Sequence, residues 1–394
     1  MTAPTPGFSE LARTARVVIC SGPGGVGKTT TAAAIGVEAA LEGRRVVVVT
    51  IDPAKRLADA LGLAGGLTNE PARIDLPARV GPAARTGRSR STRPKAATAT
   101  APGELWAVML DTRATFDGIV RRYSGTPDQA EAILANPFYR NISGALSGTQ
   151  EYMAAEKLYE LHHDDRFDLV VVDTPPTRNA LDFLDAPGRL TRFLDHRLYK
   201  ALMLPTRVGL RVVNVAAQVF LKSIAKVVGG DVIADVMAFF QAFDGMEAGF
   251  RSRAEAVTGL LQAPTTRYVV VTSPRREAVA EARYFAGRLR DHHLQVAAVV
   301  VNRMHPRFDQ RPAAELRAEA DAARASGSAG AEGLANLAEL VTVAEGESAM
   351  VEPLLAETGA VPVATVPLLV NDVHDLGGLA EIARHLFASP AVRG

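Results

Sequence analysis

Cysteine, net charge and long apolar runs are all scarce in this sequence, and each scarcity excludes a class of protein. The single cysteine, Cys20, excludes an internal disulfide framework, a zinc ribbon and a cysteine-ligated iron–sulfur cluster within one subunit. A formal net charge of +1 provides no overall positive field for nucleic acid or anionic lipid, so we expect no nucleic-acid partner. No stretch of about 18 consecutive apolar residues occurs, so we expect no helix that spans a membrane.

The N-terminus also lacks the basic start and apolar core of a secretory signal, so the expected location is cytoplasmic. The histidine pairs at 162–163 and 292–293 are more typical of solvated helix ends than of metal ligands. Length and apolar content, in contrast, are ample. With 394 residues and 47% hydrophobic side chains, the chain can form two average domains or one large α/β domain with insertions.

A glycine-rich segment near the N-terminus matches the phosphate-binding loop G-x-x-x-x-G-K-[ST] through Gly22, Gly27, Lys28 and Thr29. It follows a predicted strand and precedes a predicted helix over residues 31–41, which is the context that the motif requires. Backbone N–H groups of such a loop bind phosphate, the lysine reaches the β- and γ-phosphates, and the threonine hydroxyl binds Mg²⁺. The predicted nucleotide-binding residues of this loop are Gly24, Gly25, Val26, Gly27, Lys28, Thr29 and Thr30.

Two further apolar runs end in a carboxylate: residues 45–51 lead into Asp52, and residues 169–172 lead into Asp173. Continuous apolar runs are typical of parallel strands buried on both faces, and ligands bind at the carboxyl edge of such sheets. Four apolar residues followed by Asp173, downstream of a phosphate loop, predict the Walker-B carboxylate that supports Mg²⁺.

Strand and helix patterns alternate to the C-terminus and predict an α/β fold, a P-loop NTPase with a mostly parallel, doubly wound sheet and an inserted α-helical subdomain. One helical pattern, with a soft break, covers residues 306–348. The basic stretch 79–103 predicts a disordered insertion, and a solvated loop is favoured there over a site for an anionic partner. The expected P-loop domain comprises residues 1–111, 166–184 and 263–394, and the expected helical subdomain comprises residues 112–165 and 185–262.

The segment 198–250 is apolar at helical spacing and contains methionine, phenylalanine and scattered basic residues. Three interpretations stay open: core of the helical subdomain, packing against a second subunit, and a groove for an apolar protein client. Flexible methionine side chains suit the third. For most of these positions the sequence favours the core.

Five motifs follow one another along the chain: GGVGKTT at 24–30, DPA at 52–54, DTPPT at 173–177, VVN at 300–302 and VPL at 366–368. Together they resemble the arsenical-pump and tail-anchored-protein-targeting ATPases, dimeric members of the deviant-Walker-A P-loop ATPases, over nearly the whole chain. Residues 50–57 and 179–187 look most like the actinobacterial ion-transporting branch of that family.

The resemblance implies a dimeric ATPase that uses ATP and Mg²⁺ and couples its nucleotide state to the helical subdomain. Asp52 would orient the attacking water from a first switch, which makes Lys28 and Asp52 the implied catalytic residues. Asn302 would bind the edge of adenine, and Pro367 would lie near its face. Loss of the γ-phosphate would let the switch loops relax. The implied metal-binding residues are Thr29, Asp52 and Asp173.

Three departures from the family pattern affect the functional interpretation. Where the family usually carries a lysine that crosses the dimer to the partner's phosphates, this chain has Pro23, which lacks both charge and an N–H donor. Lys55, Arg56 or the lysine of a paralogous partner could replace that cation, so homodimer and heterodimer both stay open. The family's C-x-x-C zinc clamp and its arsenite-binding cysteines are absent as well, so metalloid stimulation is not expected.

The leading hypothesis is a cytoplasmic Mg-ATP-dependent ATPase. The alternative is a nucleotide-gated regulatory or scaffold subunit that hydrolyses little ATP alone and acts with a lysine-bearing paralogue. A partition-type ATPase that acts on DNA or membrane is disfavoured, because residues 375–394 form no clear basic amphipathic helix.

Overall fold

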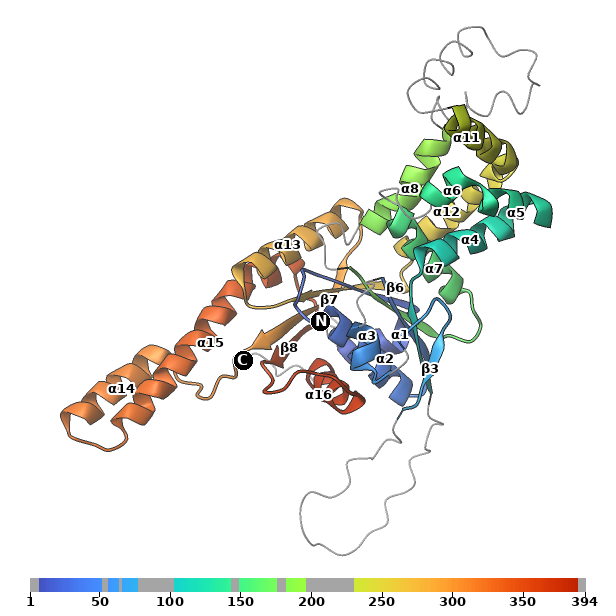
Figure 1. The fold of residues 1–394 in the computed structure, drawn as a ribbon. Coiled ribbons are helices and arrows are strands. Elements are labelled where there is room, and N and C mark those ends of the chain that lie inside the picture. The colour runs from blue at the N-terminus through green and yellow to red at the C-terminus, as the bar shows by residue number, and fades with distance from the viewer. Residues whose placement is uncertain are drawn as a thin grey trace, which may run out of the picture. The chain divides into compact units, whose positions relative to one another are not determined.

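The computed structural model describes residues 7–51, 56–63, 66–76, 103–142, 149–175, 182–195 and 230–388. The chain divides into two compact units (Figure 1). The sheet unit comprises Met1–Met109, Asp164–Ala180 and Pro264–Gly394, and the helical unit comprises Leu110–His163 and Leu181–Ala263. Among the described helices, none is long and apolar enough to cross a membrane.

The sheet unit is built on eight strands in the order β3-β4-β2-β5-β1-β6-β7-β8. Only β3 pairs antiparallel with its neighbour; the other pairings among the described strands are parallel, which confirms the predicted α/β fold class. β1 lies between β5 and β6, so the loop that follows it emerges at the middle of the sheet. The strands are β1 (Val17–Ser21), β2 (Arg45–Thr50), β3 (Ala72–Ile74), β4 (Glu104–Met109), β5 (Leu169–Asp173), β6 (Thr266–Thr272), β7 (Val296–Met304) and β8 (Val363–Pro367).

Burial explains why the apolar runs form these strands. Every residue of β1 and β5 is buried, and β2 is buried except at Arg45. α2 packs across β2, β4 and β5, and α16 packs on α2. The helices of the sheet unit are α1 (Phe8–Thr14), α2 (Lys28–Leu41), α3 (Arg56–Ala60), α13 (Arg276–Asp291), α14 (Ala313–Ala325), α15 (Ala331–Thr358) and α16 (Leu376–Phe387).

The helical unit has an aromatic core. Phe239, Phe240 and Phe243 are buried, and the ring of Phe243 lies 5.0 Å from that of Phe250, centroid to centroid. These positions of the segment 198–250 therefore belong to the core, whereas residues 196–229 lie outside the described part of the chain. The helices of this unit are α4 (Thr112–Tyr123), α5 (Pro127–Ala135), α6 (Pro137–Ile142), α7 (Thr149–His162), α8 (Asp182–Asp195), α11 (Gly230–Phe243) and α12 (Glu247–Gln262).

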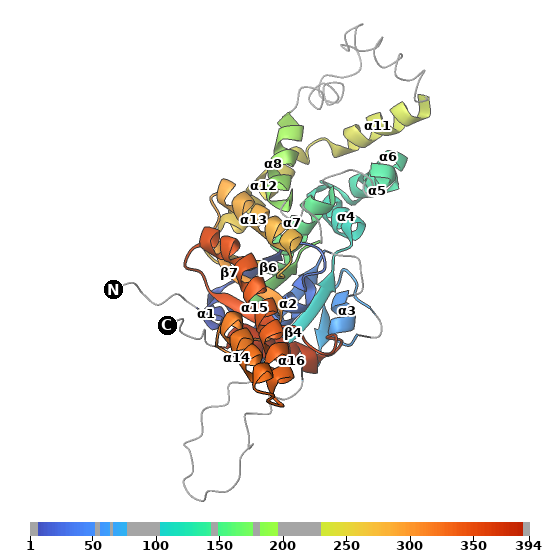
Figure 2. The ribbon, with the colours of Figure 1, turned by 90° about the vertical axis from the view of Figure 1, so that its left-hand side faces the viewer.

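The long helical pattern predicted over 306–348 is wrong at both ends. Helix α14 begins only at Ala313, because side chains bond the backbone before it: Arg307 Nε donates to the Asp309 carbonyl at 2.9 Å. Helix α15 continues to Thr358 through Pro353. Proline removes one helical N–H bond, but Val351 and Leu354 on either side are buried and hold the helix against the unit. Figure 2 shows α14 and α15 side by side as a hairpin.

Candidate functional site

The loop after β1 is pressed against the ends of two neighbouring strands. A Cβ atom on Gly22 would lie 2.0 Å from the carbonyl oxygen of Val271, so only glycine fits there. Gly27 has a left-handed backbone with φ of 93°, and a Cβ atom on it would lie 2.3 Å from Nδ2 of Asn302. Because Gly27 turns the chain, α2 begins at Lys28, three residues before the predicted start of the helix.

Lys28 is held inside the loop. Its side chain is buried, and Nζ donates a hydrogen bond of 2.9 Å to the carbonyl oxygen of Pro23. Pro23 cannot donate, but its carbonyl fixes the lysine across the loop. The ammonium group therefore lies beside the backbone that a phosphate would contact.

Threonine and aspartate side chains from three elements meet at the other side of Lys28. Thr29 Oγ1 at the start of α2 donates to Oδ2 of Asp173 at 2.8 Å, and Thr50 Oγ1 at the end of β2 donates to the same oxygen at 3.0 Å. Asp173 is fully buried at the end of β5. A hydroxyl beside a carboxylate is a set of oxygen donors that suits Mg²⁺, directly or through water.

Cys20 lies next to this carboxylate but takes no part as a thiolate. Burial, and then the negative charge of Asp173, raise the pKa of the Cys20 thiol well above its usual range. The thiol therefore stays protonated, and Cys20 is the small buried apolar side chain that its position in the first strand predicts. Among the described residues, no group of three or more His, Cys, Asp and Glu side chains could hold a metal ion.

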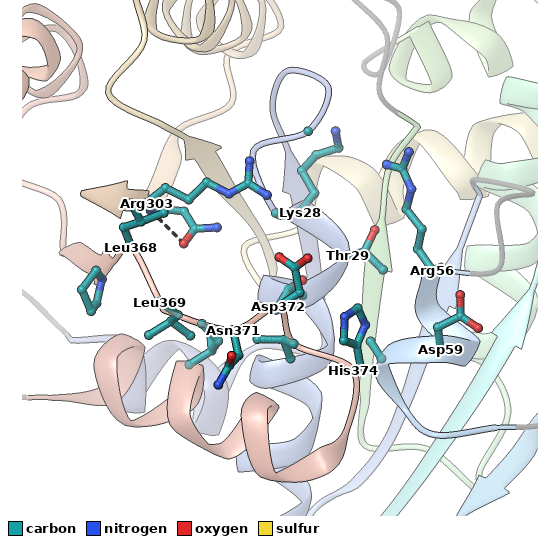
Figure 3. A pocket seen from close by; sticks show the side chains of 18 of the residues that line it. Lys28, Thr29, Arg56, Asp59, Arg303, Leu368, Leu369, Asn371, Asp372 and His374 are labelled. Atoms are coloured by element: carbon teal, nitrogen blue, oxygen red, sulfur yellow. Dashed lines mark hydrogen bonds between the residues drawn. The ribbon is translucent and has the colours of Figure 1, made fainter. Parts of the chain in front are cut away.

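A cavity of about 480 Å³ opens beside the loop (Figure 3). This volume is typical of sites for small ligands. Gly25, Gly27, Lys28, Thr29 and Thr30 form its floor. The wall at the ends of β7 and β8 is formed by Asn302, Arg303, Pro367, Leu368, Leu369, Asn371, Asp372 and His374, and the opposite wall by Arg56 and Asp59.

The residues predicted to contact adenine line this same cavity. Asn302 Nδ2 donates to the carbonyl oxygen of Val26 at 2.8 Å, so the amide ties the end of β7 to the loop. Pro367 ends β8 beside it. The structure therefore brings Asn302 and Pro367 together with Lys28 and Thr29.

Other predicted site residues are placed differently. The side chain of Val26 is buried in the core, and Gly24 is exposed in the loop outside the lining of the cavity. Asp52, Pro53, Ala54 and Lys55 lie outside the described residues.

Sequence reasoning missed Asp59, Arg303, and the loop that contributes Asn371, Asp372 and His374. A signal was present for Arg303 and for the loop. Arg303 directly follows the VVN motif at 300–302, the loop lies a few residues after the VPL motif at 366–368, and the carboxyl ends of parallel strands meet at the edge where ligands bind.

The model of one protein family, described as anion-transporting ATPase, matches residues 15–78 and 105–325 of this chain. The chain belongs to the anion-transporting ATPase family. The break in the match contains the stretch 79–103 that the sequence predicts as an insertion. Membership of this family supports a nucleotide-binding ATPase.

The curated relatives include proteins named ATPase GET3 and arsenical pump-driving ATPase. The ATPase GET3 of Paracoccidioides lutzii is 22% identical over 301 residues, 74% of each chain. The ATPase GET3 of Malassezia globosa is 27% identical over 177 residues, 45% of this chain and 44% of its own. The arsenical pump-driving ATPase of Escherichia coli is 28% identical over 196 residues, 48% of this chain and 28% of its own. The chain thus spans less than half the length of the Malassezia and Escherichia relatives.

Proposed function

We propose that this protein binds Mg-ATP in the cavity beside the phosphate loop and hydrolyses it, as a dimer in the cytoplasm. One observation supports this most strongly: Lys28 and Thr29 form part of the floor of a cavity whose wall contains Asn302 and Pro367, and Thr29 Oγ1 donates to the buried carboxylate of Asp173. A nucleoside triphosphate requires groups that bind its phosphates, oxygen ligands for a divalent cation, and a cavity next to them that can receive its base.

Each side chain has a separate task in this proposal. The loop N–H groups and Lys28 bind the β- and γ-phosphates, with Lys28 Nζ exchanging the Pro23 carbonyl for phosphate oxygens. Thr29 and Asp173 hold Mg²⁺, which when bound neutralises charge on the phosphate oxygens. Asp52 orients the attacking water, and Asn302 and Pro367 receive the adenine.

This chain has Pro23 in place of the lysine that crosses the dimer in the family, and the proposal therefore takes two forms. Arg56 lines the cavity and is a candidate for the cation that Pro23 does not provide. If a cation of this chain, such as Arg56 or Lys55, suffices, the protein hydrolyses ATP alone. If none suffices, it is a regulatory or scaffold subunit that needs a lysine-bearing paralogue. Pro23 is the observation that favours this second form. In both forms the helical unit is the element that responds to nucleotide state and binds an apolar protein client.

ATP turnover by the purified full chain and by Lys28→Ala tests the proposal. Loss of the lysine removes the charge that neutralises the transferred phosphoryl group, so we expect turnover to fall by about a hundredfold or more. Arg45→Gln is the matched control, since Arg45 lies at the opposite end of β2 from Thr50 and should leave turnover unchanged. Measurable turnover that is equal in wild type and Lys28→Ala would contradict the proposal.

Native mass and composition with and without ATP separate the two forms. Turnover by a homodimer supports the autonomous enzyme. Tight Mg-ATP binding with turnover only after a lysine-bearing paralogue is added supports the regulatory subunit. Brisk turnover alone excludes that second form.

A further inference from the structure

The end of β7 has an unusual backbone. Arg303 has a φ of +63°, a left-handed backbone conformation that residues other than glycine, asparagine and aspartate rarely adopt. The register between β7 and β8 also shifts between Asn302 and Met304, so the strand bulges at this residue. Strain of this kind persists where the surrounding structure imposes it, and it gathers at functional sites.

The bulge changes which way two successive side chains point. In a regular strand, neighbours lie on opposite faces of the sheet, yet Asn302 and Arg303 both line the cavity. The turned backbone is held by Asn302, whose Oδ1 accepts the Arg303 N–H at 2.9 Å while its Nδ2 donates to Val26 in the loop. The phosphate loop and the strained residue are therefore fixed to each other through one amide.

The guanidinium of Arg303 is available to a ligand. The side chain is exposed, and it forms no ion pair with any residue that the structure describes. The next basic side chains along the chain differ: His305 contacts Glu347 at 2.6 Å, Arg307 pairs with Glu345 at 3.1 Å, and Arg311 pairs with Asp309 at 2.8 Å. Figure 3 shows the Arg303 side chain extending from β7 toward Lys28 at the phosphate loop.

We propose that Arg303 contacts the phosphates of the bound nucleotide and so supplies, from the same chain, a cation that Pro23 cannot provide. This inference rests on the proposed function, because it assigns a contact within the same site. A guanidinium binds phosphate oxygens through paired N–H groups, which makes arginine well suited to such a contact. The phosphates rather than the base are assigned, since the side chain extends toward Lys28.

The test is the affinity of the full chain for Mg-ATP, Mg-ADP and adenosine, with adenosine measured by competition against a fluorescent ATP analogue. Arg303→Asn removes the charge but keeps a residue that tolerates positive φ, so the bulge should persist. We expect Mg-ATP to bind about ten- to a hundredfold more weakly, as for a lost charge-assisted contact, and adenosine to bind within about twofold of wild type.

Arg307→Gln is the matched control, because Arg307 is a cation of the same segment whose charge is already paired with Glu345. Its Mg-ATP affinity should equal that of wild type. Equal weakening of adenosine and Mg-ATP by Arg303→Asn would overturn the phosphate contact in favour of a role in holding the loop. Unchanged Mg-ATP affinity in Arg303→Asn would overturn the inference alone. Absence of Mg-ATP binding by the wild type would overturn the proposed function and the inference with it.

Discussion

The sheet unit and the helical unit each join two elements distant in sequence through an arginine–carboxylate pair, and the two pairs differ in exposure. In the sheet unit, Arg45 at the start of β2 lies 2.7 Å from Asp168, with side chains 47% and 36% exposed. In the helical unit, Arg253 of α12 donates to Glu156 of α7 at 2.7 Å, with side chains 10% and 3% exposed. Water screens the first pair and is excluded from the second, so the same chemistry has different consequences for stability.

Two tyrosines surround the buried Arg253–Glu156 pair. The guanidinium of Arg253 also lies 3.7 Å above the ring of Tyr159. Burial, with a further contribution from the charge of Glu156, raises the pKa of Tyr152 well above its usual range, so this neighbour stays neutral. The pair thus joins α7 and α12, whereas the strands of the sheet unit are joined by the backbone hydrogen bonds of their pairing and by burial of their apolar side chains.

The largest effect is expected from removing one charge of the buried pair. Glu156→Gln leaves Arg253 buried without its carboxylate, so the free energy of unfolding should fall by about 3–5 kcal/mol. Urea unfolding followed by circular dichroism measures this. The fluorescence of Trp106, the single tryptophan, reports the sheet unit separately, and its transition should shift less.

A double variant provides the control for this prediction. Glu156→Leu with Arg253→Met replaces both charges by apolar groups of similar size, so much of the lost stability should return. A loss below about 1 kcal/mol in Glu156→Gln would mean that the pair behaves like an exposed one, and the contrast between the units would then fail.

A middle-sized effect is expected from the apolar packing of the sheet unit. A Cβ atom on Gly36 of α2 would lie 2.5 Å from Cγ2 of Val48 in β2, so Gly36→Ala should lower the free energy of unfolding by about 1–3 kcal/mol. Gly287→Ala in α13 is the control, because no heavy atom lies within 4 Å of its Cβ position. There the variant should gain up to about 1 kcal/mol from helix propensity. Similar Trp106 unfolding curves for the two variants would contradict this.

The same contrast explains what could be predicted from the sequence. The apolar runs of β2 and β5 and the loop around Lys28 are local patterns, so they predicted the sheet and the floor of the cavity. Glu156 and Arg253 are 97 positions apart, and nothing local indicates that they meet.

The cavity wall likewise contains features that no local sequence pattern predicts. The left-handed turn at Arg303 is imposed by Asn302 and a bulge against β8, and arginine itself does not indicate it. The edge strand β3 has three residues and was not predicted either, because so short a segment shows no periodicity. The role of Asp52 stays a prediction.

The smallest effect is expected from Arg45→Gln at the exposed pair. In the wild type, the side-chain hydrogen bonds and the charge of Arg45 lower the pKa of Asp168. The backbone N–H of residue 45 donates to the same carboxylate, and this hydrogen bond remains in the variant. The free energy of unfolding should therefore fall by less than about 1 kcal/mol at neutral pH. Since the folded state has the lower pKa, this contribution is present above the ordinary carboxyl pKa of about 3.9 and disappears as the pH falls through the folded value. Wild type and Arg45→Gln should thus differ at pH 7 and converge in acid; a difference that persists in acid would assign the effect to packing of the arginine stem.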